Sequence, residues 1–454
     1  MAPLEDINEK VFFDELKMTL VNDDMDGFRS EFIELHPYDQ SVFFENQHKN
    51  ERMKVYSYLS PKEIASIMEN IELEDAEKFI TEMDPRFAAM VLADVAVDDA
   101  VDILQELTKD QIASFLAIMN PKSANEIKTL LHYEDKTAGS IMTTEFVSFL
   151  ETQTVKQTLL EMKTLAPAAE TIYYTYVLDE EDKLKGVISL RDLIVADEDE
   201  RLSDLMNQNV LSISVGRDQE EVAQMIRDYD LLALPVVDFQ DHLIGIITVD
   251  DALDVIDEEA IDDYSKFAAL TDAPSSDSRP LEAAKKRLPW LIILLFLGML
   301  TASLIDGFEE TLEAVPRVAM FIPLIAGMAG NAGTQSLAVA VRGLATGDYG
   351  TGKRILLIIK ELGTGLLVGL SCGIVVILMI TVWKGDMYLG FLVGFVILVT
   401  LTVATLSGSL IPLLMQKLNI DPAVASGPFI TTLNDLTSIL IYFGMATIFM
   451  SYLI

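Results

Sequence analysis

The first third of the chain repeats one pattern of apolar and polar positions every twelve residues. The positions that open the units are Leu59, Ile71, Met83, Val95, Leu107, Met119 and Leu131. Further apolar residues follow five and eight positions later, which places them on one face of a short helix. Short helices of this kind cannot bury their faces alone, so the pattern predicts a stacked helical solenoid over residues 1–136. Residues 1–50 do not show the repeat, and the pattern gives them no role.

A longer duplication follows, in which β-rich and helical runs alternate twice. The first copy covers residues 137–200 and contains GVISLRD, and the second covers 201–257 and contains GIITVDD. This arrangement predicts a tandem α/β module, and it resembles a pair of CBS repeats, the adenosyl-binding regulatory module. The resemblance implies that Ser189 and Thr248 face a ribose or phosphate, and that Asp192 and Asp251 face the ribose hydroxyls. The alternative is that these residues only form turns and helix caps, without a ligand.

Five long apolar runs occupy residues 288–454, after a connecting helix and hinge that we place at 258–287. They are Pro289–Ile305, Val318–Val341, Leu362–Trp383, Met387–Gln416 and Ala423–Ile454. Each run can cross a hydrocarbon core of about 30 Å, so they predict an all-α transmembrane domain with five helices. Basic residues gather on the flanks that share the side of the N-terminus. We therefore expect the N-terminus in the cytosol and the C-terminus outside.

The net charge of −38 is concentrated in the part before the apolar runs. Residues 288–454 hold nine acidic and seven basic side chains, which leaves 62 acidic and 26 basic ones in residues 1–287. Such a body repels nucleic acid and attracts cations. The single cysteine, Cys372, excludes a disulfide framework. The four histidines are scattered, and no nucleophile motif is present. We therefore expect a protein that is not an enzyme.

One carboxylate, Asp435, stands deep in the last apolar run, and we take it as the only acidic side chain deep in any run. A charge at the bilayer centre costs at least about 2.5 kcal/mol, which indicates a function. The second run adds glycines around Asn331, and the last run places Gly427 and Thr431 at helical spacing with Asp435. Oxygen ligands without a basic partner favour a hard divalent cation; Mg²⁺ suits a site with few charges, and Ca²⁺ and Mn²⁺ stay open.

The order of modules and the motifs PLIAGMAGNAGTQS and SGPFITTLNDLTSILIYF together resemble the MgtE family of bacterial magnesium channels. The resemblance implies a homodimer in the plasma membrane with the pore on its two-fold axis. Asp435 would bind hydrated Mg²⁺ there, with Asn331 beside it and oxygens offered by Gly427 and Thr431.

The resemblance also implies that the soluble domains sense cytosolic Mg²⁺. The matching acidic residues are Asp98, Asp102, Asp218, Glu220, Asp230, Asp251, Asp254, Glu259, Asp262 and Asp263. In the first CBS repeat, Arg191 and Asp192, next to Ser189, match positions associated with ATP, which would act as a regulator.

These features favour a gated Mg²⁺ channel that imports the ion down its electrochemical gradient. Two other functions stay open. The first is a carrier that couples Mg²⁺ to H⁺ or Na⁺ through Asp435. The second is a membrane sensor that transports nothing and whose CBS repeats report nucleotide levels to a partner; the polar positions in the second and last runs argue against it.

Overall fold

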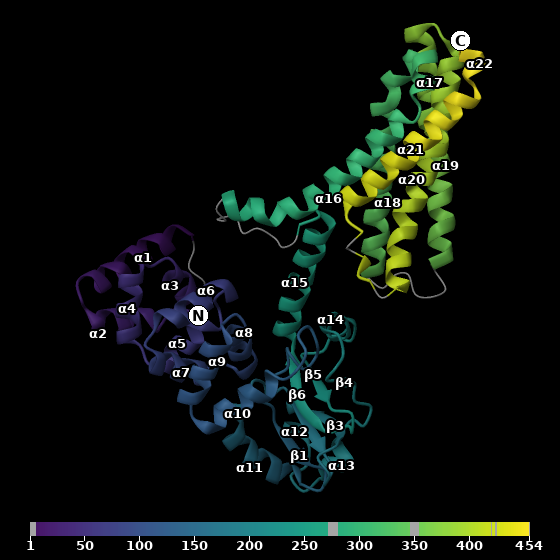
Figure 1. Cartoon of the computed structure of the whole chain (residues 1–454). Helices are drawn as coiled ribbons and strands as arrows, with labels where there is room; N and C mark the ends of the chain where they lie inside the picture. Colours follow the sequence, from purple (N-terminus) through teal and green to yellow (C-terminus); the bar gives the residue numbers. More distant parts are fainter. Residues whose placement is uncertain (1–5, 271–279, 346–353, 419, 423–424, 454) are drawn as a thin grey trace. The chain divides into compact units, whose positions relative to one another are not determined.

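The computed structural model describes residues 6–270, 280–345, 354–418, 420–422 and 425–453 (Figure 1). The chain divides into two compact units, Met1–Ile256 and Asp257–Ile454. Part of the expected hinge, residues 271–279, lies outside the described residues. The described elements confirm the three predicted kinds of structure: a helical N-terminal part, a pair of small α/β repeats, and long apolar helices.

The first unit begins with ten helices. They are α1 (Asp6–Val21), α2 (Met25–Phe32), α3 (Pro37–Glu45), α4 (Lys49–Tyr58), α5 (Pro61–Met68), α6 (Leu73–Glu82), α7 (Pro85–Asp94), α8 (Val97–Gln105), α9 (Lys109–Ile118) and α10 (Pro121–Leu130). From α2 to α10 each helix begins twelve residues after the previous one. Proline opens several of them, at the position where its missing N–H costs nothing. Their inward faces form one continuous hydrophobic core.

The expectation that residues 1–50 lie outside the repeat is wrong for residues 25–50, because α2, α3 and α4 begin in step with the later helices, whereas α1 does not. The sequence pattern fails there because polar residues stand at positions that are apolar in later units. Gln47 and Arg52 occupy the places of Leu59 and Ile64, and both are buried, with 6% and 5% exposure. They pack inside the solenoid as its apolar counterparts do.

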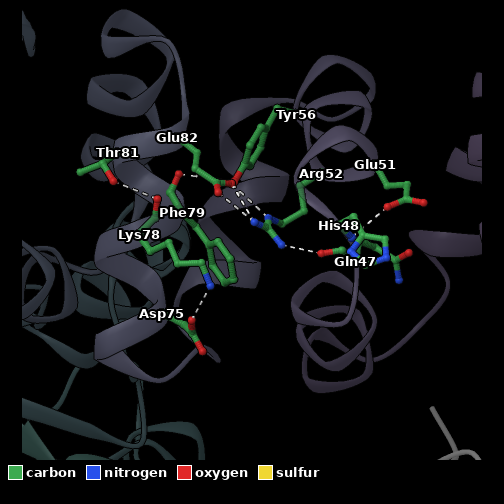
Figure 2. Close-up of polar contacts among 10 residues, drawn as sticks. All are labelled: Gln47, His48, Glu51, Arg52, Tyr56, Asp75, Lys78, Phe79, Thr81 and Glu82. Carbon is green, nitrogen blue, oxygen red and sulfur yellow. Dashed lines mark hydrogen bonds and ion pairs between the residues drawn. The ribbon is translucent and has the colours of Figure 1, made fainter. Parts of the chain in front are cut away.

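Burial of Arg52 is balanced by partners from α6 and from the turn before α4 (Figure 2). Its guanidinium lies 2.9 Å from Glu82 of α6, donates a hydrogen bond to the Gln47 carbonyl oxygen, and stacks 4.5 Å from the centre of the Phe79 ring. A buried charge of this kind is tolerated only when it is paired and hydrogen-bonded. The contacts tie α4 to α6 and so extend the solenoid toward the N-terminus.

The two α/β repeats have the same topology. In the first, β1 (Ser148–Leu150) runs parallel to β2 (Tyr174–Leu178), which is antiparallel to β3 (Leu184–Ser189). In the second, β4 (Ile213–Ser214), β5 (Ala233–Val237) and β6 (Leu243–Thr248) repeat that order. The helices of the two repeats are α11 (Val155–Leu165), the 3-10 helix η1 (Ala166–Ala168), α12 (Leu190–Val195), α13 (Leu202–Leu205) and α14 (Gln219–Asp228). The duplication read from the sequence is thus a duplication of structure.

An acidic helix, α15 (Val249–Phe267), follows β6, and the membrane helices come after it. They are α16 (Pro280–Asp306), α17 (Glu309–Ala314), the 3-10 helix η2 (Pro316–Phe321), α18 (Ile322–Ala345), α19 (Arg354–Lys384), α20 (Met387–Lys417), α21 (Gly427–Ile448) and α22 (Met450–Leu453). Five stretches of the described chain are long and apolar enough to cross a membrane: Ala283–Asp306, Pro316–Leu344, Arg354–Lys384, Met387–Lys417 and Gly427–Ile448. Within this unit α20 packs against α18, α19 and α21.

Candidate functional site

The helices α18 and α21 meet closely at a glycine of α18. A methyl group added to Gly330 would lie 2.8 Å from Cγ2 of Thr431 and 3.7 Å from a carboxylate oxygen of Asp435. A side chain at this position would push the helices apart, so only glycine lets the α18 backbone pass so near to Asp435. The structure therefore brings the glycine-rich segment of α18 together with the polar face of α21.

Asp435 is half-buried on α21. Across the described part of the chain, its carboxylate makes no hydrogen bond and no ion pair with another residue. A carboxylate in a membrane helix needs a partner charge or water. Its unused oxygens can bind a cation, either directly or through the waters that Mg²⁺ retains.

The other three residues expected at this site lie on the same two helices. Gly427 is the first residue of α21, and its carbonyl oxygen accepts a hydrogen bond of 2.9 Å from the Thr431 hydroxyl. Asn331 is exposed on α18, and Gln335 one turn further along is exposed as well. A polar pair that faces outward from a membrane helix needs protein or water beside it, because lipid offers no hydrogen bonds.

Asn434 takes a larger part in the helix contact than its sequence position indicated. It is buried with 2% exposure, its carbonyl oxygen accepts a hydrogen bond of 2.6 Å from Ser407 of α20, and its amide nitrogen points at Gly333 of α18. It thus joins α21 to both neighbouring helices, directly beside Asp435. In the sequence, Asn434 stood out only as a polar residue within an apolar run, and this did not indicate that it contacts Ser407 and Gly333.

A second candidate site in the first unit is a group of carboxylates around α8. Asp98 is buried, with 8% exposure, and one of its carboxylate oxygens has no hydrogen-bond partner. Burial, together with the charges of Asp251 and Asp99, raises the pKa of Asp98 well above its usual value. Burial and the charges of Glu69 and Asp251 raise the pKa of Asp99 to about 8. Two of the expected sensor residues, Asp98 and Asp251, thus lie near each other.

Three members of this group were missed by sequence reasoning. They are Glu69, Asp99 and Glu170. Burial and the charge of Asp251 raise the pKa of Glu170 to about 7, and burial raises the pKa of Glu69 and of Asp251. We call Glu69, Asp98, Asp99, Glu170 and Asp251 the acid cluster. Its members come from the solenoid and from both CBS repeats, so no local pattern could have joined them.

The remaining expected sensor residues lie near the acid cluster or have local roles. Asp102 raises the pKa of Asp99, and Asp254 raises that of Asp251. Asp218 caps α14 by accepting a hydrogen bond of 2.9 Å from the backbone N–H of Glu220, and Asp230 has a left-handed backbone with φ 52° after that helix.

At the end of α15, in the second unit, a lysine bridges two acids. Lys266 lies 2.9 Å from Asp262 and 2.5 Å from Asp421. Burial and the charge of Asp421 raise the pKa of Asp263, and the charge of Glu259 raises it further. The expected sensor residues at the end of α15 are therefore already next to a positive charge, the ammonium group of Lys266.

Neither candidate site has a preformed set of protein ligands for a metal ion among the described residues. Within the described ranges, no three His, Cys, Asp or Glu side chains are spaced as ligands of one ion. The acid cluster is instead a concentration of negative charge. Such a place suits a cation that keeps much of its water, as Mg²⁺ does.

The residues expected to face a nucleotide form helix caps in both CBS repeats. The Ser189 hydroxyl lies 2.6 Å from the Asp192 carboxylate and accepts a hydrogen bond from the Asp192 N–H. Thr248 and Asp251 form the same contact at 2.5 Å. Arg191 is exposed, 3.7 Å from Asp192. The capping alternative accounts for these contacts, and the exposed edge of Arg191 is open to a ligand.

Five stretches that can span a membrane, a carboxylate on one of them that has no partner among the described residues, and a pair of CBS repeats define a transport protein for cations. Family models support this class: one described as a divalent cation transporter matches residues 322–445, the MgtE intracellular N domain matches 35–136, and the CBS domain matches 138–199 and 202–258.

Similarity to known proteins extends over almost the whole chain. The magnesium transporter MgtE of Enterococcus faecalis is 52% identical over 96% of this chain and 96% of its own length. That of Bacillus subtilis is 38% identical over 97% of this chain and 99% of its own. A crystal structure of the cytosolic domain of the Mg²⁺ channel MgtE in complex with ATP has a TM-score of 0.51 and 35% identity, and it covers 54% of this chain and 99% of that one. The chain belongs to the MgtE family.

Proposed function

We propose that the chain is a Mg²⁺ channel whose pore is lined by α18 and α21. The observation that carries this proposal is the carboxylate of Asp435, held on a membrane helix against Gly330 without a basic partner among the described residues. Asn331, Thr431 and the Gly427 carbonyl supply neutral oxygens on the same two helices. A hydrated Mg²⁺ binds through such oxygens without losing its whole water shell. The names of the full-length relatives agree with this substrate.

The pore is proposed to form between two copies of the chain. Asn331 and Gln335 are exposed on α18 in a single copy, and they need a polar environment inside a bilayer. A second copy related by a two-fold axis gives them one, and it places the two Asp435 side chains on opposite sides of one water-filled path. Closed two-fold dimers are also the commonest soluble assembly.

We further propose that the acid cluster senses Mg²⁺ on the cytosolic side. Burial raises the pKa values of Asp98 and Asp99, and the charges of neighbouring carboxylates raise them further, so the ionised carboxylates repel one another. A divalent cation removes that repulsion and favours a compact form, which we assign to the closed channel. This requires the N-terminus in the cytosol and the C-terminus outside a bacterial plasma membrane, as the flanking basic residues predict.

ATP is proposed as a second regulator, bound at Ser189, Arg191 and Asp192. The support is the solved relative that contains ATP and the exposed guanidinium of Arg191. We propose the following domain boundaries: a solenoid at 1–136, CBS repeats at 137–200 and 201–257, a connecting segment at 258–287 and a pore domain at 288–454.

The purified chain in liposomes provides the test. We expect Mg²⁺ uptake by the wild-type protein, and unitary currents in a patch containing Mg²⁺ as the only permeant cation. Asp435→Asn keeps the shape and removes the charge, so uptake should fall to the level of empty liposomes. Glu310→Gln, which removes an exposed charge on α17, should leave uptake unchanged. Normal uptake by the Asn variant would show that Asp435 only packs the helices, and saturable flux coupled to protons without current steps would show a carrier.

A further inference from the structure

A second carboxylate lies buried inside the membrane unit. Glu361 of α19 is 8% exposed, and one of its carboxylate oxygens lies 2.6 Å from the hydroxyl of Ser336 on α18. Sequence reasoning did not single out this residue. The apolar run was taken to begin at Leu362, whereas α19 begins at Arg354 and its candidate span includes Glu361.

The hydroxyl of Ser336 joins three helices at one point. Besides the contact with Glu361, it lies 2.7 Å from the carbonyl oxygen of Thr405 on α20. Ser336 itself is 3% exposed. The Ser336 hydroxyl has a single proton, so it donates to either the Glu361 carboxylate or the Thr405 carbonyl oxygen at a time, and all three residues are buried away from lipid and water.

The position of Glu361 on its helix shows why this contact matters. The buried face of α19 continues from Glu361 through Gly365, Gly369 and Gly373. These glycines let α19 lie directly against α20, where a methyl group at Gly369 would be 2.7 Å from the Leu398 carbonyl oxygen. The helices α18 and α19 each pack along α20 but hardly along each other. The Glu361–Ser336 contact is a direct polar link between them.

Ser336 lies on the proposed pore helix itself. On α18, the buried residues Gly333 and Ser336 face the neighbouring helices of the same chain, while Asn331 and Gln335 are exposed. A hydrogen bond at Ser336 therefore limits rotation of α18 about its own axis. Rotation of α18 would turn Asn331 away from the proposed pore and would move Gly330 relative to Asp435.

We infer that Glu361 is a positioning residue for the pore, which acts through Ser336 to fix the rotation of α18. This inference rests on the proposed function of α18 and α21. Glu361 need not touch the ion; its role is to accept the Ser336 hydrogen bond. A residue of this kind should affect the apparent affinity for Mg²⁺ and the discrimination between ions, beyond any effect on the amount of folded protein.

The test compares Glu361→Ala, Glu361→Gln and Ser336→Ala in the full chain in liposomes, with flux normalised to correctly inserted dimer. Glu361→Ala and Ser336→Ala should each raise the KM for Mg²⁺ about threefold or more, the effect of losing one membrane hydrogen bond. Both should also weaken the preference for Mg²⁺ over Ca²⁺. Glu361→Gln retains an acceptor oxygen and should stay near the wild type. The double variant should be no worse than either alanine variant, because both remove the same bond.

Thr364→Ala is the matched control, since Thr364 is exposed on the same helix and its hydroxyl donates a hydrogen bond to the Lys360 carbonyl oxygen of that helix. It should leave the KM unchanged. An unchanged KM and ion preference in Glu361→Ala would overturn the inference, as would a loss in Glu361→Gln equal to that in Glu361→Ala. If the wild type itself carried no Mg²⁺ flux, or if Asp435→Asn kept it, the proposed function would fail instead.

Discussion

At the scale of single residues, Arg52 shows how a charged side chain can take an apolar position in a repeat. Its pair with Glu82 is almost fully buried, with side-chain exposures of 6% and 11%. Removal of one partner from such a pair leaves the other charge buried and unpaired, which typically costs 3–5 kcal/mol.

Arg52→Ala should therefore destabilise the N-terminal helices by roughly 3 kcal/mol. Hydrogen exchange of the α4 and α6 amides in the full chain measures this locally, where a single unfolding midpoint does not. Arg86→Ala, at an exposed position of α7, should leave exchange unchanged. Equal protection of α4 in Arg52→Ala and the wild type would mean that the Phe and Tyr side chains around it hold the helix without the ion pair.

At the scale of elements, the separation of the membrane helices is set by glycines. A methyl group at Gly333 would lie 1.8 Å from the amide nitrogen of Asn434, and one at Gly408 would lie 2.3 Å from the Gly333 carbonyl oxygen. These contacts leave no space between α18, α20 and α21. The distance between the two proposed pore helices is therefore determined by residues that do not face the ion.

Gly333→Ala should push α21 away from α18 and so reduce Mg²⁺ uptake severalfold, with an overpacking cost of about 1–3 kcal/mol. Gly444→Ala, on α21 where nothing lies within 4 Å of an added methyl, should transport normally. The measurement is uptake into liposomes at equal amounts of folded protein. Full activity of Gly333→Ala would indicate that Asn434 can rotate away without moving the helices.

At the scale of the whole molecule, the acid cluster should make stability depend on both pH and Mg²⁺. Its folded pKa values, about 7 for Glu170 and about 8 for Asp99, lie above the unfolded values near 4. The folded state then binds more protons than the unfolded state between these values. The contribution to stability is complete below about pH 4 and is lost as the pH rises toward 8.

Without divalent cations, the unfolding temperature of the full chain should fall between pH 6 and pH 8.5. Mg²⁺ competes with protons for the carboxylates, so the ion should raise this temperature more at pH 8.5 than at pH 6. Calorimetry checks both expectations. The variant Asp98→Asn, Asp99→Asn, Asp251→Asn has no charge to lose at these positions and should respond less to pH and to Mg²⁺. The same Mg²⁺ effect at both pH values would count against a carboxylate site.

Periodic features of the molecule could be predicted from the sequence, and features that join distant residues could not. The solenoid and the duplicated repeats follow from spacings of twelve residues and from two similar segments. The first units of the solenoid were missed because Gln47 and Arg52 are polar, and a polar residue is expected to be exposed unless a buried partner is known. The partner of Arg52 is Glu82, which lies 30 residues away in the sequence.

The same distinction applies to the candidate sites: one residue could be found from the sequence, and those that depend on distant neighbours could not. Asp435 stood out because nothing near it in sequence is charged, whereas Glu361 follows Lys360 directly and looked like the polar end of a span. Glu69 and Glu170 join Asp98 and Asp99 only in the folded chain. No periodicity marks them, since their nearness depends on how the solenoid and the CBS repeats pack.

The equal spacing of the helix starts from Met25 to Pro121 also bears on how this region can change in evolution. Each unit presents its apolar face in the same direction as the next, so the gain or loss of one whole unit leaves every later face in register. An insertion of another length would turn all later faces away from their neighbours and would displace Asp98 and Asp99. Length variation among natural variants of this region is therefore expected in steps of twelve residues, and toward the end that lies before the acid cluster.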